Sequence, residues 1–178
     1  MLLTPLTTVA ALLVLAGAAK LRAPQTAAAA LAHGGLPVRG LAVRLIGGLE
    51  VGLGLAAIGV PSPALAVAIA GAYASFAVVT VRLLRAGEQA RCGCFGARSS
   101  PVHPIHLALN LTGVAVATAA ALTPVGTGLP AVVFAHPAGG AILAASAAAA
   151  TVLAHQAYVA VPALWGAWTA ARPPAPSA

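Results

Sequence analysis

Five long runs of apolar residues dominate the sequence, and short segments rich in proline, glycine and charge separate them. An α-helix needs about 20 apolar residues to cross the hydrocarbon core of a membrane, and each run approaches or exceeds that length. Only 6% of the residues are charged, so the chain lacks the polar side chains that a water-soluble domain exposes. We therefore predict an all-α integral membrane protein, a four-helix transmembrane bundle with a fifth C-terminal transmembrane helix. The predicted spans are about 2–19, 38–60, 64–86, 104–122 and 141–165.

The predicted spans belong to a single domain, residues 1–170, and the proline-rich end of the chain, residues 171–178, is expected to be disordered. After the first span, residues 24–32 form a short helix that cannot cross a membrane. Residues 123–140 are rich in proline and glycine, and we expect them to form a loop with a short apolar piece.

Two local patterns predict how the helices begin and pack. Gly48 and Gly52 in the second span have the GxxxG spacing that lets membrane helices approach closely. At the start of the fourth span, Ser99 or Ser100 is expected to cap the helix, with a proline in its first turn.

The positive charges indicate the orientation in the membrane. With the N-terminus outside, five spans place every Lys and Arg on one side, which the positive-inside rule makes cytoplasmic. These residues are Lys20, Arg22, Arg39, Arg44, Arg82, Arg85, Arg91, Arg98 and Arg172. The net charge of +7 comes from cations at the ends of apolar runs, so the expected partner is the lipid bilayer and nucleic-acid binding is not expected.

The reactive residues are concentrated between the third and fourth spans, in Arg91-Cys-Gly-Cys-Phe-Gly-Ala-Arg98, which holds both cysteines of the chain. Cations such as Arg91 and Arg98 and a nearby helix N-terminus stabilise a thiolate over a thiol, so Cys92 and Cys94 should be reactive. A disulfide across one intervening residue is strained and therefore readily exchanged. This pattern favours a redox pair, with a metal site or a structural role as alternatives.

The metal alternative combines the two cysteines with His103 and His106 in a C-x-C-x8-H-x2-H pattern. Histidines three residues apart lie on one side of a helix, and two thiolates with two imidazoles suit zinc. Zinc sites usually separate their cysteines by two to four residues, so the spacing of Cys92 and Cys94 fits imperfectly.

Glu50 is an acidic residue near the middle of the second span, where an ionisable group needs a partner. Lys20 and Arg22, at the end of the first span, are the natural candidates. The pair could be structural or could relay protons. We also expect the polar residues within later spans to hydrogen-bond across the bundle; they are Asn110, His155 and Gln156.

Three motifs occur in a characteristic order, and together they resemble a known family. They are Ala16-Gly17-x-x-Lys20-Leu21-x-x-Pro24, Glu50-x-Gly52-Leu53, and Cys92-Gly-Cys-Phe-Gly96 followed by Pro101-Val102 and Asn110. Over about residues 10–122 the chain resembles the DoxX/MauE superfamily of small membrane proteins, and specifically its methylamine-utilisation (MauE) branch. The resemblance implies a four-helix core located in a bacterial plasma (inner) membrane.

The resemblance also implies thiol–disulfide chemistry with a thioredoxin-like partner, in maturation of a disulfide-containing protein. Cys92 and Cys94 would be the catalytic pair, and the resemblance marks Lys20 and Glu50 as motif positions without assigning them a role. We count Lys20 and Glu50, together with the neighbouring cations Arg91 and Arg98, as supporting residues. The pattern differs at His103 and Pro104, where the family tends to carry serine and an aromatic residue. Cysteines facing outward would suit exported substrates, in contrast to the cytoplasmic loop that the charges predict. The sequence assigns no cofactor, although a quinone is a candidate electron acceptor. A non-catalytic assembly factor is the remaining alternative.

Overall fold

The computed structural model is all-α, as predicted, and describes residues 2–87, 92–93, 95, 100–123 and 125–171. Within these residues the helices are α1 (Leu3–Arg22), α2 (Pro24–His33), α3 (Gly40–Gly59), α4 (Pro63–Ala86), α5 (Pro104–Leu122), α6 (Leu129–Ala135) and α7 (Pro137–Ala170). Among the described helices, α1, α3, α4, α5 and α7 are long and apolar enough to cross a membrane. The chain is therefore a multi-pass membrane protein with the five predicted spans.

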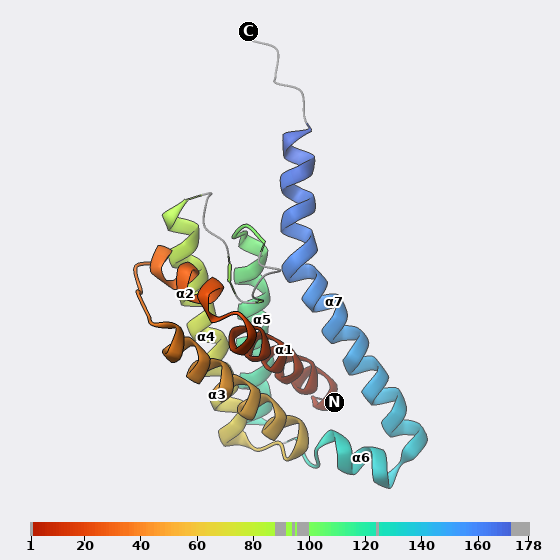
Figure 1. Cartoon of the computed structure of the whole chain (residues 1–178). Coiled ribbons are helices and arrows are strands. Elements are labelled where there is room, and N and C mark those ends of the chain that lie inside the picture. The colour runs from red at the N-terminus through yellow and green to blue at the C-terminus, as the bar shows by residue number, and fades with distance from the viewer. Residues whose placement is uncertain (1, 88–91, 94, 96–99, 124, 172–178) are drawn as a thin grey trace.

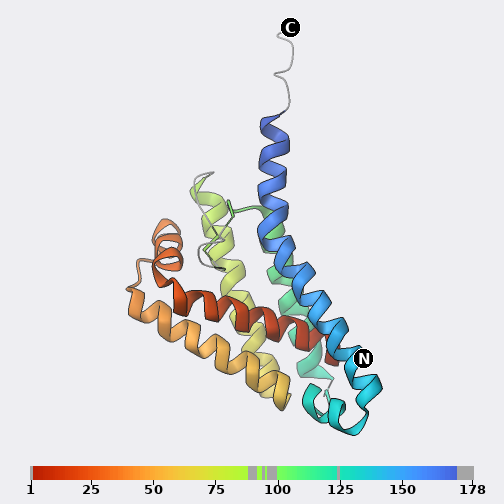
Figure 2. The same cartoon turned by 45° about the vertical axis from the view of Figure 1, so that its right-hand side comes forward.

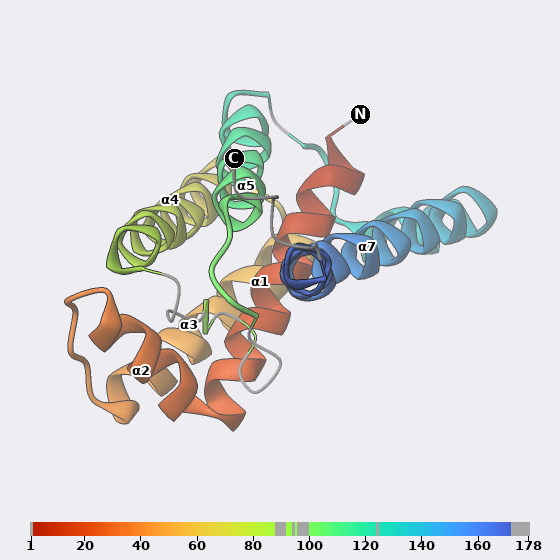
Figure 3. The same cartoon turned by 90° about the horizontal axis from the view of Figure 1, so that it is seen from above.

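The four helices of the bundle form two side-by-side pairs, α1 with α3 and α4 with α5 (Figure 1). α3 and α4 are joined by a short turn and separate with distance from it, and α2 lies near the open end of this V (Figure 2). α7 packs along α1 and α5 and continues beyond the bundle. Seen from above, α2 and α7 lie at different edges of the molecule (Figure 3).

The prediction of a loop over residues 123–140 is wrong for most of that segment, because α6 and the first turn of α7 lie within it. Pro130 and Pro137 are in the first turns of these helices. Proline is tolerated there, since the N–H that it lacks would have no partner within the helix. Starting at Pro137, α7 is longer than the predicted span and includes Trp168.

α1 and α3 pack through glycines, but not through the predicted GxxxG pair. A Cβ atom on Gly47 would lie 2.8 Å from a carbonyl oxygen of α1, and one on Gly54 would lie 2.6 Å from another. A Cβ on Gly48 or Gly52 would meet nothing within 4 Å. Residues seven apart share a helix face, so Gly47 and Gly54 line the same seam. The buried residues of α3 follow this seam, and they are Val43, Gly47, Glu50, Gly54 and Ala57.

The outer faces of the helices are apolar, as a lipid environment requires. Leu41, Leu45 and Leu49 follow one another at four-residue intervals on α3, and all three side chains are exposed. Inside the bundle, the Tyr73 hydroxyl of α4 donates a hydrogen bond of 2.8 Å to the carbonyl of Val9 in α1. The bundle thus buries a core in which alanine alternates with larger side chains such as Leu13, Ile69 and Tyr73, and it presents leucine to the lipid.

The successive spans alternate in direction, so the C-terminal ends of α1 and α4 lie at the same end of the bundle as the N-terminal ends of α3 and α5 (Figure 1). That end carries Arg22, Arg39, Arg82 and Arg85, which agrees with the predicted gathering of positive charge. Arg91, Arg98, Arg172 and the predicted disordered tail from residue 172 onward lie outside the described residues. The assignment of this end to the cytoplasm stays a prediction.

Candidate functional site

A buried ion pair joins α1 to α3 at the centre of the candidate site. Lys20 Nζ lies 2.7 Å from Glu50 Oε2, and the two residues are only 7% and 5% exposed. Glu50 lies ten residues after the start of α3, midway along this 20-residue helix. The predicted partner Lys20 is therefore confirmed, whereas Arg22 is exposed. An unpaired charge inside a membrane costs several kcal/mol, so each residue allows the other to remain ionised.

The ion pair also contacts an aromatic ring, and one of its oxygens lacks a hydrogen-bond donor. Lys20 Nζ also lies 4.8 Å from the centre of the Phe76 ring on α4, a distance suited to a cation–π interaction. In the described structure, Glu50 Oε1 is buried and accepts no hydrogen bond. A carboxylate oxygen can accept two, and burying it without a donor is unfavourable. Glu50 Oε1 can therefore accept a hydrogen bond from a bound molecule.

The segment containing Cys92 is held against α2. The Cys92 amide donates a hydrogen bond of 3.1 Å to the carbonyl of Ser100, which closes the loop. Gly93 has a φ of 68°, and a Cβ there would lie 2.6 Å from the Cβ of Ala30. Only glycine combines this conformation with so close a contact. Cys92 itself is 6% exposed, so its side chain is buried at this end of the bundle.

A cavity of about 300 Å³ brings together three of the predicted site residues. Cys92, Lys20 and Glu50 all line it, together with Phe76 and apolar side chains of α2, α3 and α4. The sequence grouped Lys20 and Glu50 with the cysteines as supporting residues, but no pattern in it predicted that they line the same cavity. The other predicted site residues, Cys94, Arg91 and Arg98, lie outside the described part of the chain.

His103 and His106 cap the start of α5, the role predicted for Ser99 or Ser100. His103 Nδ1 accepts a hydrogen bond of 3.2 Å from the Ile105 amide, and His106 Nδ1 accepts one of 3.0 Å from the His103 amide. An imidazole can replace the hydroxyl of a usual capping residue because it too offers an acceptor close to the backbone. Ser99 lies outside the described residues.

The same contacts bear on the metal alternative. His106 Nε2 lies 2.9 Å from the carbonyl of Tyr158, so both ring nitrogens of His106 are engaged in hydrogen bonds. Among the described residues, no group of three or more His, Cys, Asp and Glu side chains could hold a metal ion. With Cys94 outside these residues, the structure gives the four-ligand site no support.

α7 holds the other side of the cysteine loop, mainly through Tyr158. Ser100 Oγ donates a hydrogen bond of 2.9 Å to the Tyr158 carbonyl. The Phe95 ring lies 5.3 Å from the Tyr158 ring and 4.8 Å from that of His155, in edge-to-face contacts. Gln156, which was predicted to bond across the bundle, is exposed instead.

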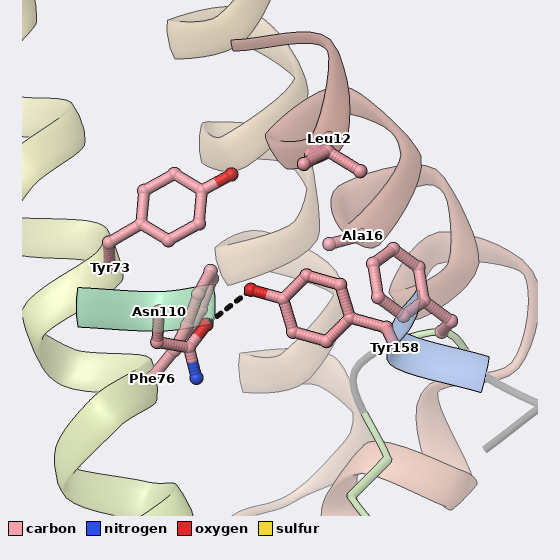
Figure 4. Close-up of a pocket in the computed structure, with 7 residues that line it drawn as sticks. Leu12, Ala16, Tyr73, Phe76, Asn110 and Tyr158 are labelled. Carbon is pink, nitrogen blue, oxygen red and sulfur yellow. Dashed lines mark hydrogen bonds between the residues drawn. The ribbon is translucent and has the colours of Figure 1, made fainter. Parts of the chain in front are cut away.

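The Tyr158 side chain also reaches into the bundle. Its hydroxyl donates a hydrogen bond of 2.8 Å to Asn110 Oδ1 (Figure 4), and Asn110 Nδ2 donates one of 3.1 Å to Thr80 Oγ1. The prediction that Asn110 bonds across the bundle is confirmed. The sequence analysis missed Tyr158, and it predicted a capping role for Ser100 in place of this contact with α7. A phenol inside a run of alanine and valine was the available signal, because a buried tyrosine usually needs a hydrogen-bond partner.

Comparison with known proteins identifies the bundle. Residues 1–124 match the family model described as "Methylamine utilisation protein MauE". The match includes α1 to α5 and the cysteine loop, and it excludes α6 and α7. No curated protein and no solved structure matched the chain.

Proposed function

Since the chain belongs to the MauE family, we propose that it is a membrane-embedded thiol–disulfide redox protein. Cys92 and Cys94 form its reactive pair, and a thioredoxin-like protein is its partner. The exchange serves the maturation of a disulfide-containing protein, as the family's association with methylamine utilisation suggests. The proposed location is the plasma membrane of a bacterium.

The reaction is a two-step thiol–disulfide exchange. A thiolate attacks one sulfur of the partner's disulfide, forms a mixed disulfide and releases the partner's other sulfur as a thiolate. The second thiolate then attacks the mixed disulfide, which closes the Cys92–Cys94 bond and releases the partner as a dithiol. Two electrons pass to the partner, and the reverse sequence returns them. We assign the first attack to Cys94 and the second to Cys92, whose burial suits a residue that does not itself meet the partner protein.

The observation that carries this proposal is the fixed position of Cys92. The loop is closed by the amide of Cys92, packed on α2 through Gly93 and joined to α7 through Ser100. A cysteine with no more than a packing role would not need a left-handed glycine beside it and anchors on two helices. Exchange between neighbouring sulfurs, in contrast, depends on their exact approach.

Alkylation in intact cells tests the redox role. We expect a maleimide reagent to label Cys92 and Cys94 fully only after treatment with a reductant, and a Cys92→Ser variant to trap a mixed disulfide with a thioredoxin-like protein. The Cys92→Ser/Cys94→Ser double variant is the control, since it should neither label nor trap. Equal labelling with and without reductant would contradict the proposal.

A membrane-impermeant maleimide determines the side of the membrane. The positive charges predict that the reagent labels Cys92 and Cys94 only after the cells are opened. Labelling of intact cells would place the cysteine end outside and make exported proteins the substrates. The thiol chemistry itself would be unaffected by that result.

A further inference from the structure

We propose that the cavity between α2, α3 and α4 binds the ring of a membrane quinone, which exchanges electrons with the cysteine pair. This inference rests on the proposed thiol chemistry and names the small-molecule redox partner of the same site. Lys20 and Glu50 would bind the polar groups of the ring, and the apolar walls would enclose its carbon skeleton.

The polar groups of the cavity match a quinone in both of its redox states. Glu50 Oε1 is an unused acceptor, 5% exposed as a residue, and it suits the hydroxyl of a hydroquinone. Lys20 Nζ has three N–H groups and shares one with Glu50 Oε2, so another can donate to a quinone carbonyl. One donor and one acceptor side by side fit a ring whose oxygens change between carbonyl and hydroxyl.

The rest of the cavity is apolar and reaches the lipid-facing surface. Phe76, Val43 and Val79 form part of the wall. Ile46 on α3 and Ser75 on α4 also line the cavity and are exposed. The cavity, of about 300 Å³, is at the lower end of the usual range for ligand sites, about 300–1,000 Å³. It can therefore hold a ring, while the attached chain extends between α3 and α4 into the bilayer.

Cys92 at the cavity wall gives this ligand a redox function. In the forward step the Cys92 and Cys94 thiols lose two protons and two electrons, and a sulfur–sulfur bond forms between them. The quinone takes up both electrons and both protons and becomes a hydroquinone. Reduction of a disulfide by the hydroquinone is the same step in reverse, so the balance is complete in either direction.

Electron transfer to decylubiquinone, a quinone with a short saturated chain, tests the inference in the purified full-length protein. The chain is reduced, freed of reductant under anaerobic conditions and mixed with the quinone, whose loss of absorbance is followed. We expect one quinone to be reduced per pair of thiols. The Cys92→Ser/Cys94→Ser variant should reduce none but should still be labelled in α3 or α4 by a photoreactive azido derivative.

Two neighbouring valines of α4 provide matched variants. Val79→Trp places a large ring in the cavity, whereas Val78, which is 55% exposed, points away from it. At a quinone concentration well below saturation, we expect Val79→Trp to slow quinone reduction at least about tenfold. The indole ring would occupy the space of the quinone ring, so the quinone would lose most of its contacts with the cavity. Val78→Trp should remain within about twofold of the parent, since it alters only the outer surface.

The outcomes separate this inference from the proposed function. If the thiols exchange with a thioredoxin-like protein but reduce no decylubiquinone, the quinone inference is overturned and the proposed function stands. Equal rates in Val78→Trp and Val79→Trp would also overturn it, because the cavity would not be the site. If the thiols exchange with neither partner, the proposed function fails, and with it the redox part of the inference.

Discussion

Replacing Lys20 by methionine should destabilise the protein more than replacement of an exposed cation does. The substitution keeps the unbranched shape of the side chain, one heavy atom shorter, but leaves Glu50 buried without its counter-ion, 2.7 Å away in the parent. At that distance, opposite charges attract by about 6 kcal/mol for an effective dielectric constant of about 20, and desolvation of the two ions offsets much of this. Measured losses on breaking a buried pair are about 3–5 kcal/mol, and we expect Lys20→Met to fall in that range.

The double variant Lys20→Met/Glu50→Leu distinguishes the loss of an ion pair from damage to packing. Replacing both ions by apolar side chains removes the buried charge, so its free energy of unfolding should lie within about 1 kcal/mol of the parent. Unfolding can be followed by the loss of helical circular dichroism as the detergent dodecyl sulfate is added to mixed micelles. Arg22→Met, at an exposed position, should change stability by less than about 0.5 kcal/mol. The reasoning is refuted if Lys20→Met costs less than about 1 kcal/mol, or if the double variant loses as much stability as Lys20→Met alone.

Two glycine substitutions test the local geometry of the site. Gly47→Leu should force α1 and α3 apart and cost at least about 1–3 kcal/mol in the same unfolding measurement, whereas Gly48→Leu, which meets open space, should cost less than about 1 kcal/mol. In Gly93→Ala, the left-handed backbone conformation at this position should cost about 1–2 kcal/mol, and the added methyl group should clash with α2. It should lift the loop and speed maleimide labelling of Cys92 in reduced protein, and an unchanged labelling rate would contradict the close packing.

The spans could be predicted from the sequence because the thickness of the membrane's hydrocarbon core sets their length, and polar and charged residues mark their ends. The errors lie where one residue type has two roles. The prolines of residues 123–140 suggested breaks, but proline is also favoured in the first turn of a helix, where Pro130 and Pro137 lie. Ser99 and Ser100 matched the usual cap, but His103 lies directly before Pro104 and performs that role.

The site was only partly predictable for a different reason. Glu50 is so unusual in an apolar span that a partner was required, and the nearby Lys20 followed from that requirement. The choice between Gly47 and Gly48 as the packing glycine depends on the rotation of α3 about its axis, which no local pattern fixes. The cavity depends on the divergence of α3 from α4 and on the docking of the cysteine loop, both of which are tertiary effects.

α7 belongs to the same site although it lies beyond the 124 residues that match the family. Its Tyr158 donates to Asn110 inside the bundle, and the Tyr158 carbonyl accepts from Ser100 at the end of the cysteine loop. On the other side, Gly93 fixes the loop to α2. The position of Cys92 thus depends on two helices that are far apart in the sequence. A bundle with this loop but without α7 would leave Asn110 Oδ1 without its donor, and burying it unsatisfied would cost about 1–3 kcal/mol. The Ser100 hydroxyl would keep His106 Nε2, at 3.2 Å, as its partner. In this chain α7 therefore completes the set of contacts that hold the cysteine loop on the family core.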